Sequence, residues 1–462
     1  MERILLKNLQ KEYASLEGKD VVVFGWAKTI RDSKAIGFIE LNDGTAFKSC
    51  QIVVENNLEN YSEIIKQGVG TAFKVIGEVI VTPENKQPFE IRAKHVEIAG
   101  TCSSDYPLQK KRHSLEYLRE IAYLRPRTNT FNAVFKIRSV AAYAIHNYFQ
   151  SNGFLYVHTP LITCTDCEGS DQMFKISTLN FNNLPKNKDG SADFSKDLFG
   201  KQAYITGSGQ LHGEAFAMAF SNIYTFGPTF RTENSNTKIH ANEFWMIEPE
   251  MAFCDLNQLM DIEESMLKYV VSYVMENCKD ELEFCDKFIY NGLLNRLNNL
   301  VSKQFVRISH KEVVDLLKKA DKKWEFEPDY EGDIAKEHEK YITEYFGGPV
   351  FITNWPKDIK AYYMKLNPDN KTVAAVDLVV PEAGELMGGS QREENYDKII
   401  ERMQELNIDR SNIEWYINLR KYGGCVHSGF GMGFERLVIY LTGIENIRDS
   451  IPFPRTPGNC DY

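Results

Sequence analysis

Apolar residues alternate with polar ones along most of the first hundred positions, and many of the apolar ones are β-branched or aromatic. This pattern is typical of short strands, and it predicts five of them, near residues 21–26, 38–41, 51–54, 72–82 and 89–98. A short helix is expected between the third and fourth strands, near residues 61–67. Such an arrangement fits a small closed β-barrel, with the OB-fold as the leading candidate and a barrel without a ligand as the alternative.

The pattern changes beyond the barrel. Residues 102–128 contain two prolines and a cluster of basic side chains, so we expect a hinge or linker there. Apolar residues then recur at helical spacing over about 130–152, which predicts a long amphipathic helix ended by Gly153. Further along, strands and helices alternate without the regular rhythm of a doubly wound fold. The sequence thus predicts an α+β chain in three parts: the barrel (1–101), the linker (102–128) and a larger domain (129–462). The larger domain contains a helical insertion at about 285–345.

Composition predicts a folded protein outside the membrane. Of the 462 residues, 43 % are hydrophobic and 26 % are charged, which supplies a full core and excludes wholesale disorder. No apolar run reaches the roughly 18 residues of a membrane span, and the first residues do not resemble a secretory signal. Nine cysteines, an odd number at scattered positions, indicate free thiols in a reducing compartment. We therefore expect a cytoplasmic protein.

The net charge of −10 is unusual for a protein that binds nucleic acid. Residues 102–138 nevertheless carry eight basic side chains against three acidic ones. Because a local patch, and not the global sum, decides whether a polyanion can dock, binding to nucleic acid stays possible. An ordinary solvated helix face is the alternative interpretation.

Three blocks of sequence carry candidate chemistry. The first, residues 226–248, is predicted to be a strand, a long polar loop and a second strand. Arg231 at the end of the first strand can hold a phosphate with two fixed donors, and Phe244 on the partner strand can stack on a base. Taken alone, a hairpin with a surface ion pair would explain the same residues.

The second block, residues 429–436, has alternating glycines and leads into an apolar helix that Arg436 opens. It matches neither the dinucleotide fingerprint nor a P-loop, but its glycines permit close approach to a ligand and a helix start suits an anion. The third block, residues 384–393, combines Glu385, a glycine pair and Arg392. That combination suggests a metal–phosphate site beside a second anion clamp. For the second block, tight packing of a helix on a strand is the alternative interpretation. For the third block, the alternative is a polar loop.

In this order, the three blocks resemble the class II aminoacyl-tRNA synthetases, and together with the barrel they resemble the aspartate–asparagine–lysine subgroup. The resemblance covers essentially the whole chain. It implies an OB-fold that binds the tRNA anticodon and a catalytic domain built on an antiparallel sheet flanked by helices. It also implies a homodimer, formed through the segment that ends near Pro160, and two inline steps, adenylate formation and transfer to tRNA, that need no protein nucleophile.

The resemblance implies an ATP site with Mg²⁺. The expected ATP-binding residues are Arg231, Glu233, His240, Phe244, Glu385 and Arg436, and three of them, Arg231, Glu385 and Arg436, are the expected catalytic residues. Phe244 and Arg436 would sandwich the adenine, while Arg231 would hold the α-phosphate. Glu385, together with Asp377, would bind Mg²⁺. Cys164 and Cys167 form a single Cys-x-x-Cys without a second pair, so no zinc is expected.

Within the subgroup, asparagine and tRNA(Asn) are the substrates that fit best. Aspartyl enzymes carry a Gln-Leu-aromatic-Lys-Gln segment whose Lys pairs with the substrate carboxylate, whereas this chain has Gly213 and then Glu214 at those places. An amide nitrogen needs an acceptor where a carboxylate needs a donor, so the exchange favours asparagine. Arg392 would bind the side-chain carbonyl and Glu214 the amide nitrogen. The residues expected around the α-ammonium group are Glu168, Ser208, Gln210 and Glu248.

In the barrel, the resemblance implies that Phe38 stacks on an anticodon base and that Gln51 hydrogen-bonds one, with Glu78 as a third candidate. Other functions remain open at this point. An aspartyl or non-discriminating synthetase would differ at positions 213–214. An asparagine-forming amidoligase would lack the barrel, and a non-catalytic RNA-binding paralogue would have lost the catalytic arginines or the metal-binding glutamate, all of which this chain keeps.

Overall fold

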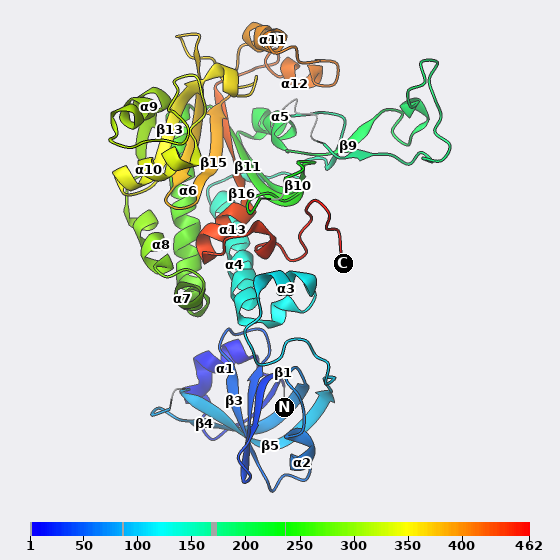
Figure 1. Ribbon diagram of the computed structural model, residues 1–462, viewed down its shortest axis with the longest axis vertical. Coiled ribbons are helices and arrows are strands. Elements are labelled where there is room, and N and C mark those ends of the chain that lie inside the picture. The colour runs from blue at the N-terminus through cyan, green and yellow to red at the C-terminus, as the bar shows by residue number, and fades with distance from the viewer. Residues whose placement is uncertain (1, 86, 168–172, 236) are drawn as a thin grey trace. The chain divides into compact units, whose positions relative to one another are not determined.

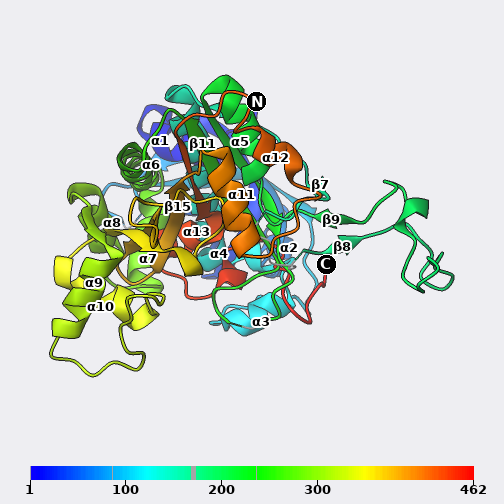
Figure 2. The same ribbon diagram turned by 90° about the horizontal axis from the view of Figure 1, so that it is seen from above.

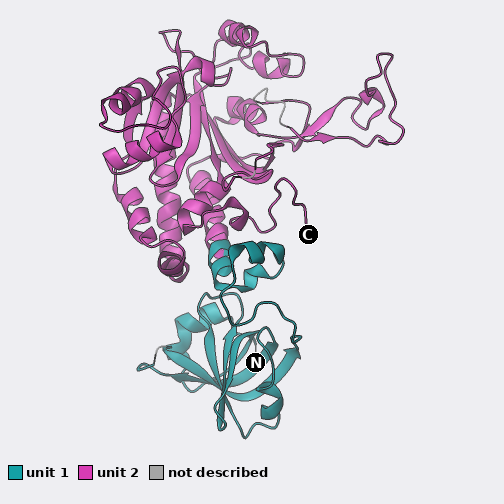
Figure 3. Cartoon of the chain, viewed as in Figure 1, with its two compact units in different colours: residues 1–135 teal, residues 136–462 magenta. Residues whose placement is uncertain are grey.

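The computed structural model describes residues 2–85, 87–167, 173–235 and 237–462. The chain divides into two compact units, residues 1–135 and 136–462 (Figure 3). The first unit contains the predicted barrel and the second contains the three blocks with candidate chemistry.

The first unit is a closed five-stranded barrel with the strand order β1-β2-β3-β5-β4 (Figure 1). Its strands are β1 (Asp20–Asp32), β2 (Ile36–Asn42), β3 (Cys50–Glu55), β4 (Ala72–Val81) and β5 (Phe89–Gly100). Buried and partly exposed residues alternate along β4, because successive side chains point to opposite faces of a strand. The helix α2 (Tyr61–Ile64) follows the third strand. The five predicted strands and the helix between the third and fourth are thus confirmed.

Further helical elements belong to this unit, and two of them occupy the segment expected to be a linker. They are α1 (Leu6–Glu12), η1 (Tyr13–Leu16), α3 (Leu115–Glu120) and η2 (Arg125–Arg127). The hydroxyl of Ser114 caps α3 by accepting a hydrogen bond from the backbone of Tyr117. The guanidinium of Arg125 is fully buried and lies 4.4 Å from the centre of the Phe131 ring. The segment is therefore folded around its own small core.

The second unit is built on an eight-stranded sheet with the order β12-β13-β14-β15-β16-β11-β10-β6. Its strands are β6 (Leu155–Tyr156), β10 (Asn222–Phe230), β11 (Glu243–Ala252), β12 (Val306–Ser309), β13 (Val350–Pro356), β14 (Thr372–Val380), β15 (Gly384–Gln391) and β16 (His427–Gly433). Neighbouring strands in the middle are antiparallel, whereas β6 and β12 at the two edges pair in parallel. The predicted α+β class with an antiparallel sheet is confirmed, with parallel pairs added at its edges.

The main helices of this unit pack on the sheet or against one another (Figures 1 and 2). They are α4 (Asn129–Ser151), α5 (Gln210–Phe220), α6 (Leu256–Asn277), α11 (Tyr396–Glu405), α12 (Glu414–Asn418) and α13 (Phe434–Thr442). The long helix predicted over 130–152 is α4. The helix α6 contacts β14, β15 and β16, while α5 contacts β10 and β11. None of the described helices combines the length and the apolar character that crossing a bilayer requires.

The region expected to be a helical insertion contains helices and one strand. The helices are α7 (Lys279–Phe288), α8 (Leu293–Ser302), α9 (His310–Lys319) and α10 (Lys336–Phe346), and the strand β12 lies between α8 and α9. Because β12 joins the edge of the main sheet, this region belongs to the same layered structure as the rest of its unit.

A smaller three-stranded sheet consists of β7 (Ile162–Thr163), β8 (Lys175–Ile176) and β9 (Ala203–Ile205). The chain between β8 and β9 projects from the rest of its unit in both Figure 1 and Figure 2. Asp197 closes the base of this projection, because its carboxylate accepts hydrogen bonds from the hydroxyls of Ser177 and Thr178, both at 2.7 Å.

Candidate functional site

A pocket of about 350 Å³ lies over the middle strands of the large sheet. It collects almost all the predicted ATP, metal and amino-acid residues: Ser208, Gln210, Arg231, Glu233, His240, Phe244, Glu248, Asp377, Glu385, Arg392 and Arg436. Of the other two predicted residues, Glu168 lies outside the described residues, and Glu214 is buried behind the pocket.

One end of the pocket combines a cation with an aromatic ring. The strands β10 and β11 pair in antiparallel register, so that Phe244 lies opposite Thr229, close to the end of β10. Arg231 follows directly after β10, and its guanidinium carbon lies 5.5 Å from the centre of the Phe244 ring. A flat, permanently charged group above a ring can bind a planar base or a phosphate.

The loop between these strands is fastened by its own side chains. The amide nitrogen of Asn242 donates to the backbone oxygens of Arg231 and Glu233, at 2.8 and 3.0 Å. The ring nitrogen Nε2 of His240 lies 3.5 Å from the Glu233 carboxylate. Because Glu233 and His240 both line the pocket, the loop presents an acceptor and an imidazole to the same space.

Arg436 lies in the first turn of α13 and faces the strand β15. Its guanidinium donates to the backbone oxygen of Glu385 at 2.9 Å, and it lies 4.0 Å from the carboxylate of the same residue. The cation and the carboxylate are each partly exposed, at 38 and 47 % of the side chain, so both can contact a ligand. A helix start with an arginine beside it is a favourable place for an anion.

The carboxylates of Glu385 and Asp377 face one another across Gly388. A Cβ atom on Gly388 would lie 3.2 Å from Glu385 Oε1 and 3.3 Å from Asp377 Oδ1, so this glycine keeps open the space between them. Burial raises the pKa of Asp377 to about 6, although the ammonium of Lys360, 2.6 Å away, opposes the shift. Among the described residues, no group of three or more His, Cys, Asp and Glu side chains converges as a metal site. Two carboxylates fit a Mg²⁺ ion whose other ligands are phosphates and water.

A further carboxylate, that of Glu248, is held at the start of α5. It accepts hydrogen bonds from the backbone of Gly209 at 3.0 Å, from the hydroxyl of Thr225 at 3.2 Å and from the hydroxyl of Ser208. A fixed carboxylate beside the polar side chains of Ser208 and Gln210 suits a primary ammonium group. The three predicted residues that the structure describes at this place therefore lie together.

Glu250 lies six residues beyond Phe244 on β11, at the buried end of the pocket, where it forms an ion pair with Arg392. Two guanidinium nitrogens donate to the carboxylate of Glu250, at 2.5 and 3.2 Å, and a third donates to the hydroxyl of Ser390 at 2.9 Å. A Cβ atom on Gly429 would lie only 2.2 Å from the Glu250 carboxylate, so the glycine in the second sequence block gives room to this pair. The pair offers a ligand donors and acceptors side by side.

The expected contact between Glu214 and a substrate amide does not fit the structure. The side chain of Glu214 is fully buried, and its oxygens already accept from the four groups that surround it: Gln210, Tyr416, Arg420 and His427, at 2.9 to 3.2 Å. Although burial alone would raise the pKa of this carboxyl, Arg420 and His427 hold it well below its usual range. Glu214 therefore supports the wall of the pocket and does not form part of its lining.

Sequence reasoning missed Glu250, the acceptor that does line the pocket. A signal was present, because Glu248 and Glu250 are two residues apart on β11 and so share one face of the strand. A Cβ atom on Gly213 would lie 3.6 Å from Cγ of Glu250, so the missing side chain at position 213 leaves space beside Glu250. The sequence also did not predict the partners of Glu214, because no local pattern links it to Arg420, Tyr416 and His427.

In the barrel, Phe38 and Gln51 lie on adjacent strands and are both partly exposed. The guanidinium carbon of Arg31 lies 5.7 Å from the centre of the Phe38 ring, and Gln51 donates to the carboxylate of Glu90 at 3.0 Å. Glu78 is on β4 and forms an ion pair with Lys94 at 3.2 Å. A partly exposed ring beside a cation is suited to stacking on a base.

Comparisons with known proteins agree on one family. Residues 114–457 match the model for tRNA synthetases class II (D, K and N), and residues 21–99 match the model for the OB-fold nucleic acid binding domain. The chain is 55 % identical to the asparagine--tRNA ligase of Clostridium tetani and 56 % identical to that of Acetivibrio thermocellus, with 100 % of each chain covered. A crystal structure of asparaginyl-tRNA synthetase from Pyrococcus horikoshii complexed with asparaginyl-adenylate is 31 % identical, with a TM-score of 0.85 over 100 % of this chain and 99 % of that one.

Proposed function

The chain belongs to the class II tRNA synthetases of the D, K and N group, in the family of asparagine--tRNA ligases, and from that premise we propose how its pocket carries out the reaction. The protein attaches L-asparagine to tRNA(Asn) in an ATP-dependent ligation that passes through an asparaginyl-adenylate and releases AMP and diphosphate. One observation carries the assignment of residues. A single pocket has an arginine–aromatic site at one end and a buried Arg392–Glu250 pair at the other.

The Arg392–Glu250 pair reads the side chain of asparagine. The amide oxygen accepts from the guanidinium of Arg392, and the amide nitrogen donates to the carboxylate of Glu250. An aspartate side chain would bring a second carboxylate to Glu250, and like charges in a buried site oppose binding. Glu248 and its neighbours Ser208 and Gln210 hold the α-ammonium group, which orients the α-carboxylate towards ATP.

The opposite end of the pocket binds ATP. Phe244 stacks on the adenine, Arg436 closes the other side of the base, and Arg231 holds the α-phosphate. Glu233 and His240 bind from the loop between β10 and β11, where His240 meets the terminal phosphates. Glu385 and Asp377 would hold Mg²⁺, which supplies neutralisation of the phosphate charge when it is bound.

Both steps proceed by positioning and charge stabilisation. The asparagine carboxylate attacks the α-phosphorus while the bond to diphosphate breaks, and Arg231 stabilises the negative charge that develops on the phosphate. The terminal ribose hydroxyl of tRNA then attacks the carbonyl carbon of the adenylate, and AMP leaves. No protein nucleophile takes part in either step.

The barrel reads the anticodon, with Phe38 as the stacking platform and Gln51 and Glu78 as edge contacts. We also propose a homodimer that forms through α4 and β6. This proposal is supported by exposed apolar side chains on both elements: Tyr143 on α4 is exposed to 59 %, and Leu155 and Tyr156 on β6 are exposed to 42 and 44 %. All nine cysteines are free, and this supports a cytoplasmic location.

Pyrophosphate exchange tests the proposal directly. Purified protein is incubated with ATP, Mg²⁺ and radioactive diphosphate, and exchange is measured with asparagine and with aspartate in parallel. We expect exchange with asparagine and little with aspartate. Exchange driven by aspartate, or by both amino acids equally, would overturn the role given to Glu250 and Arg392.

A further inference from the structure

The ATP end of the pocket depends on two elements that are supported from outside the pocket. The turn that joins β14 to β15 leads into Glu385, and the helix α13 carries Arg436 in its first turn. These elements meet where Arg436 donates to the backbone oxygen of Glu385 at 2.9 Å. A shift of either element would therefore change the distance between the proposed metal ligand and the proposed ATP-binding cation.

Arg296 on α8 bridges the same two elements on their outer side. One guanidinium nitrogen donates to the carboxylate of Glu382, in the β14–β15 turn, at 2.9 Å. Another donates to the backbone oxygen of Tyr440 on α13 at 2.5 Å. Glu382 is three residues before Glu385, and Tyr440 is one helical turn after Arg436.

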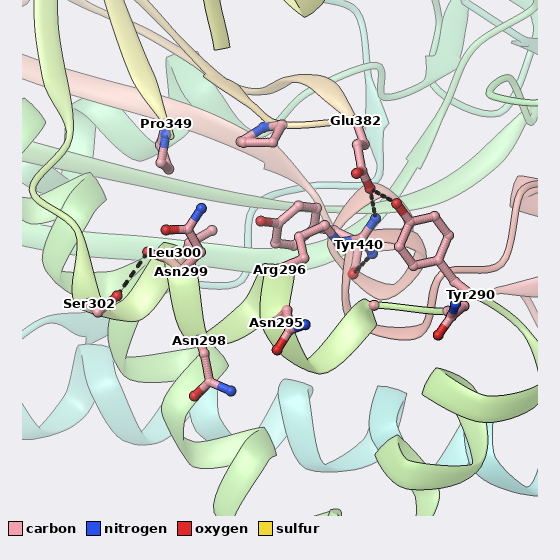
Figure 4. A pocket seen from close by; sticks show the side chains of 13 residues that line it. Tyr290, Asn295, Arg296, Asn298, Asn299, Leu300, Ser302, Pro349, Glu382 and Tyr440 are labelled. Atoms are coloured by element: carbon pink, nitrogen blue, oxygen red, sulfur yellow. Dashed lines mark hydrogen bonds and ion pairs between the residues drawn. The ribbon is translucent and has the colours of Figure 1, made fainter. Parts of the chain in front are cut away.

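The guanidinium is held in one position by aromatic rings. Its carbon lies 4.6 Å from the ring centres of both Tyr290 and Tyr440, and Figure 4 shows it between the two rings. The hydroxyl of Tyr290 also bonds to Glu382. The side chain of Arg296 is only 10 % exposed, so its direction is fixed by packing as well as by hydrogen bonds. This cluster borders a surface cavity of about 650 Å³.

Two backbone features show that the bridge acts on strained or closely packed positions. Glu382 has a positive φ of 69°, a conformation that a non-glycine residue adopts at a cost, so its carboxylate contact stabilises the turn. At the end of α13, a Cβ atom on Gly443 would lie 2.2 Å from the Cβ atom of Tyr290. The end of the helix is thus in close contact with the segment that precedes α8.

The helix α10 supports the same turn from another direction. A Cβ atom on Gly384 would lie 2.5 Å from the carboxylate of Glu339, and the backbone of Glu385 hydrogen-bonds to that carboxylate. Both supports, Arg296 and Glu339, come from the region that was predicted to be an insertion. None of these contacts involves the asparagine end of the pocket.

We propose that Arg296 is a positioning residue for ATP, which sets the geometry between Glu385 and Arg436 by bridging Glu382 to Tyr440. This inference rests on the proposed function, because it concerns the ATP end of the same pocket. It also gives the α7–α10 region a role in catalysis, since this region contacts both the turn and the helix. Arg296 is not a catalytic residue, because it acts only through its neighbours.

Three variants test the role of the bridge. Arg296→Gln removes the charge and the double contact, Arg296→Lys keeps a charge near Glu382, and Glu382→Gln removes the ion pair from the turn. The matched control is Arg307→Gln. Arg307 also pairs with a carboxylate, Asp261, and lies over a ring, that of Phe351, but these partners belong to α6 and β13 and not to the β14–β15 turn or α13.

The measurement is asparagine-dependent pyrophosphate exchange with Mg²⁺–ATP and asparagine varied separately, together with a melting temperature for each variant. We expect Arg296→Gln to raise KM for ATP roughly tenfold and to leave KM for asparagine within about twofold. Arg296→Lys should restore part of the loss, and Arg307→Gln should match the wild type. Glu382→Gln should raise KM for ATP as well. Because the Glu382 side chain is 48 % exposed, we expect this variant to fold, and it tests the proposal even if Arg296→Gln does not fold.

Unchanged KM values for ATP in folded Arg296→Gln and Glu382→Gln would overturn the proposal. Equal rises in both KM values would do so too, because they would indicate general loosening of the structure. A wild-type protein that shows no exchange with asparagine would instead contradict the proposed function, so the two failures are distinguishable.

Discussion

Arg392 donates two hydrogen bonds to Glu250, at 2.5 and 3.2 Å, and the two side chains form a nearly inaccessible ion pair at the buried end of the pocket. They come from different parts of the chain, 142 residues apart. Because both partners line the pocket, their remaining donors and acceptors face any ligand that enters it. A carboxamide, which has one acceptor and one donor group, is the complement of such a pair.

The first prediction concerns this pair. Glu250→Gln keeps the shape of the side chain but removes its charge, so the amide nitrogen of asparagine loses a charged acceptor. We expect kcat/KM for asparagine to fall about 10- to 100-fold, and the discrimination against aspartate to narrow because the repulsion is gone. Pyrophosphate exchange with each amino acid measures both changes.

Glu248→Gln is the matched control for that prediction. It changes a carboxylate on the same face of β11, but at the proposed ammonium site, so it should weaken exchange with both amino acids in parallel. If Glu250→Gln also reduced both rates in parallel, Glu250 would not be the residue that distinguishes the amide from the carboxylate.

The second prediction concerns the phosphate site. Arg231→Ala removes the cation above Phe244, and we expect adenylate formation to fall by about 100-fold or more, since it loses a fixed stabiliser of developing charge. Lys238→Ala removes a cation from the same loop, but Lys238 pairs with the exposed Glu445 and does not line the pocket. Exchange by Lys238→Ala should therefore equal that of the wild type. Comparable losses in the two variants would show that the loss follows from the loop's charge alone.

The third prediction separates the two units. Phe38→Ala removes a partly exposed ring of the barrel, and we expect it to leave asparagine-dependent exchange unchanged while lowering kcat/KM for tRNA charging roughly tenfold. Both assays use the same enzyme preparation. A variant that lost both activities to the same extent would contradict an independent reading role for the barrel.

The barrel and the long helix could be predicted from sequence because their information is local. Alternation along β4 and helical spacing along α4 are visible within ten to twenty residues. The order of the motifs resembles that of a known family, and this resemblance predicted a shared site for Arg231, Glu385 and Arg436. Its geometry could not be derived, because the contact between Arg436 and Glu385 joins residues 51 positions apart.

The role of Glu214 could not be predicted from the sequence either, because it also depends on contacts between residues far apart along the chain. An acidic residue beside Gly213 indicates an acceptor, but its partners Arg420 and His427 follow about two hundred residues later. Those partners saturate the carboxylate and bury it. The acceptor that remains for a ligand is Glu250, whose space is provided by two glycines, Gly213 and Gly429.

The fourth prediction follows from the charge of Glu214. Its pKa in the folded protein is held well below the usual range of a glutamate by Arg420 and His427, in spite of full burial. A carboxyl whose pKa is lowered by folding stabilises the protein above its unfolded-state pKa, and this contribution is lost as the pH falls towards the folded-state pKa. Glu214→Gln leaves Arg420 buried without its charge partner and should cost about 3–5 kcal/mol at pH 7.

Urea unfolding of wild type and Glu214→Gln at a series of pH values measures this contribution. The difference between their midpoints should be largest and constant at neutral pH, and it should shrink as the pH falls below about 4.5, where the unfolded wild type takes up a proton that the variant cannot. All other carboxyl groups are shared by the two proteins and cancel in the difference. A difference that did not change with pH would mean that Glu214 supports the pocket wall through its shape and hydrogen bonds alone, without its charge.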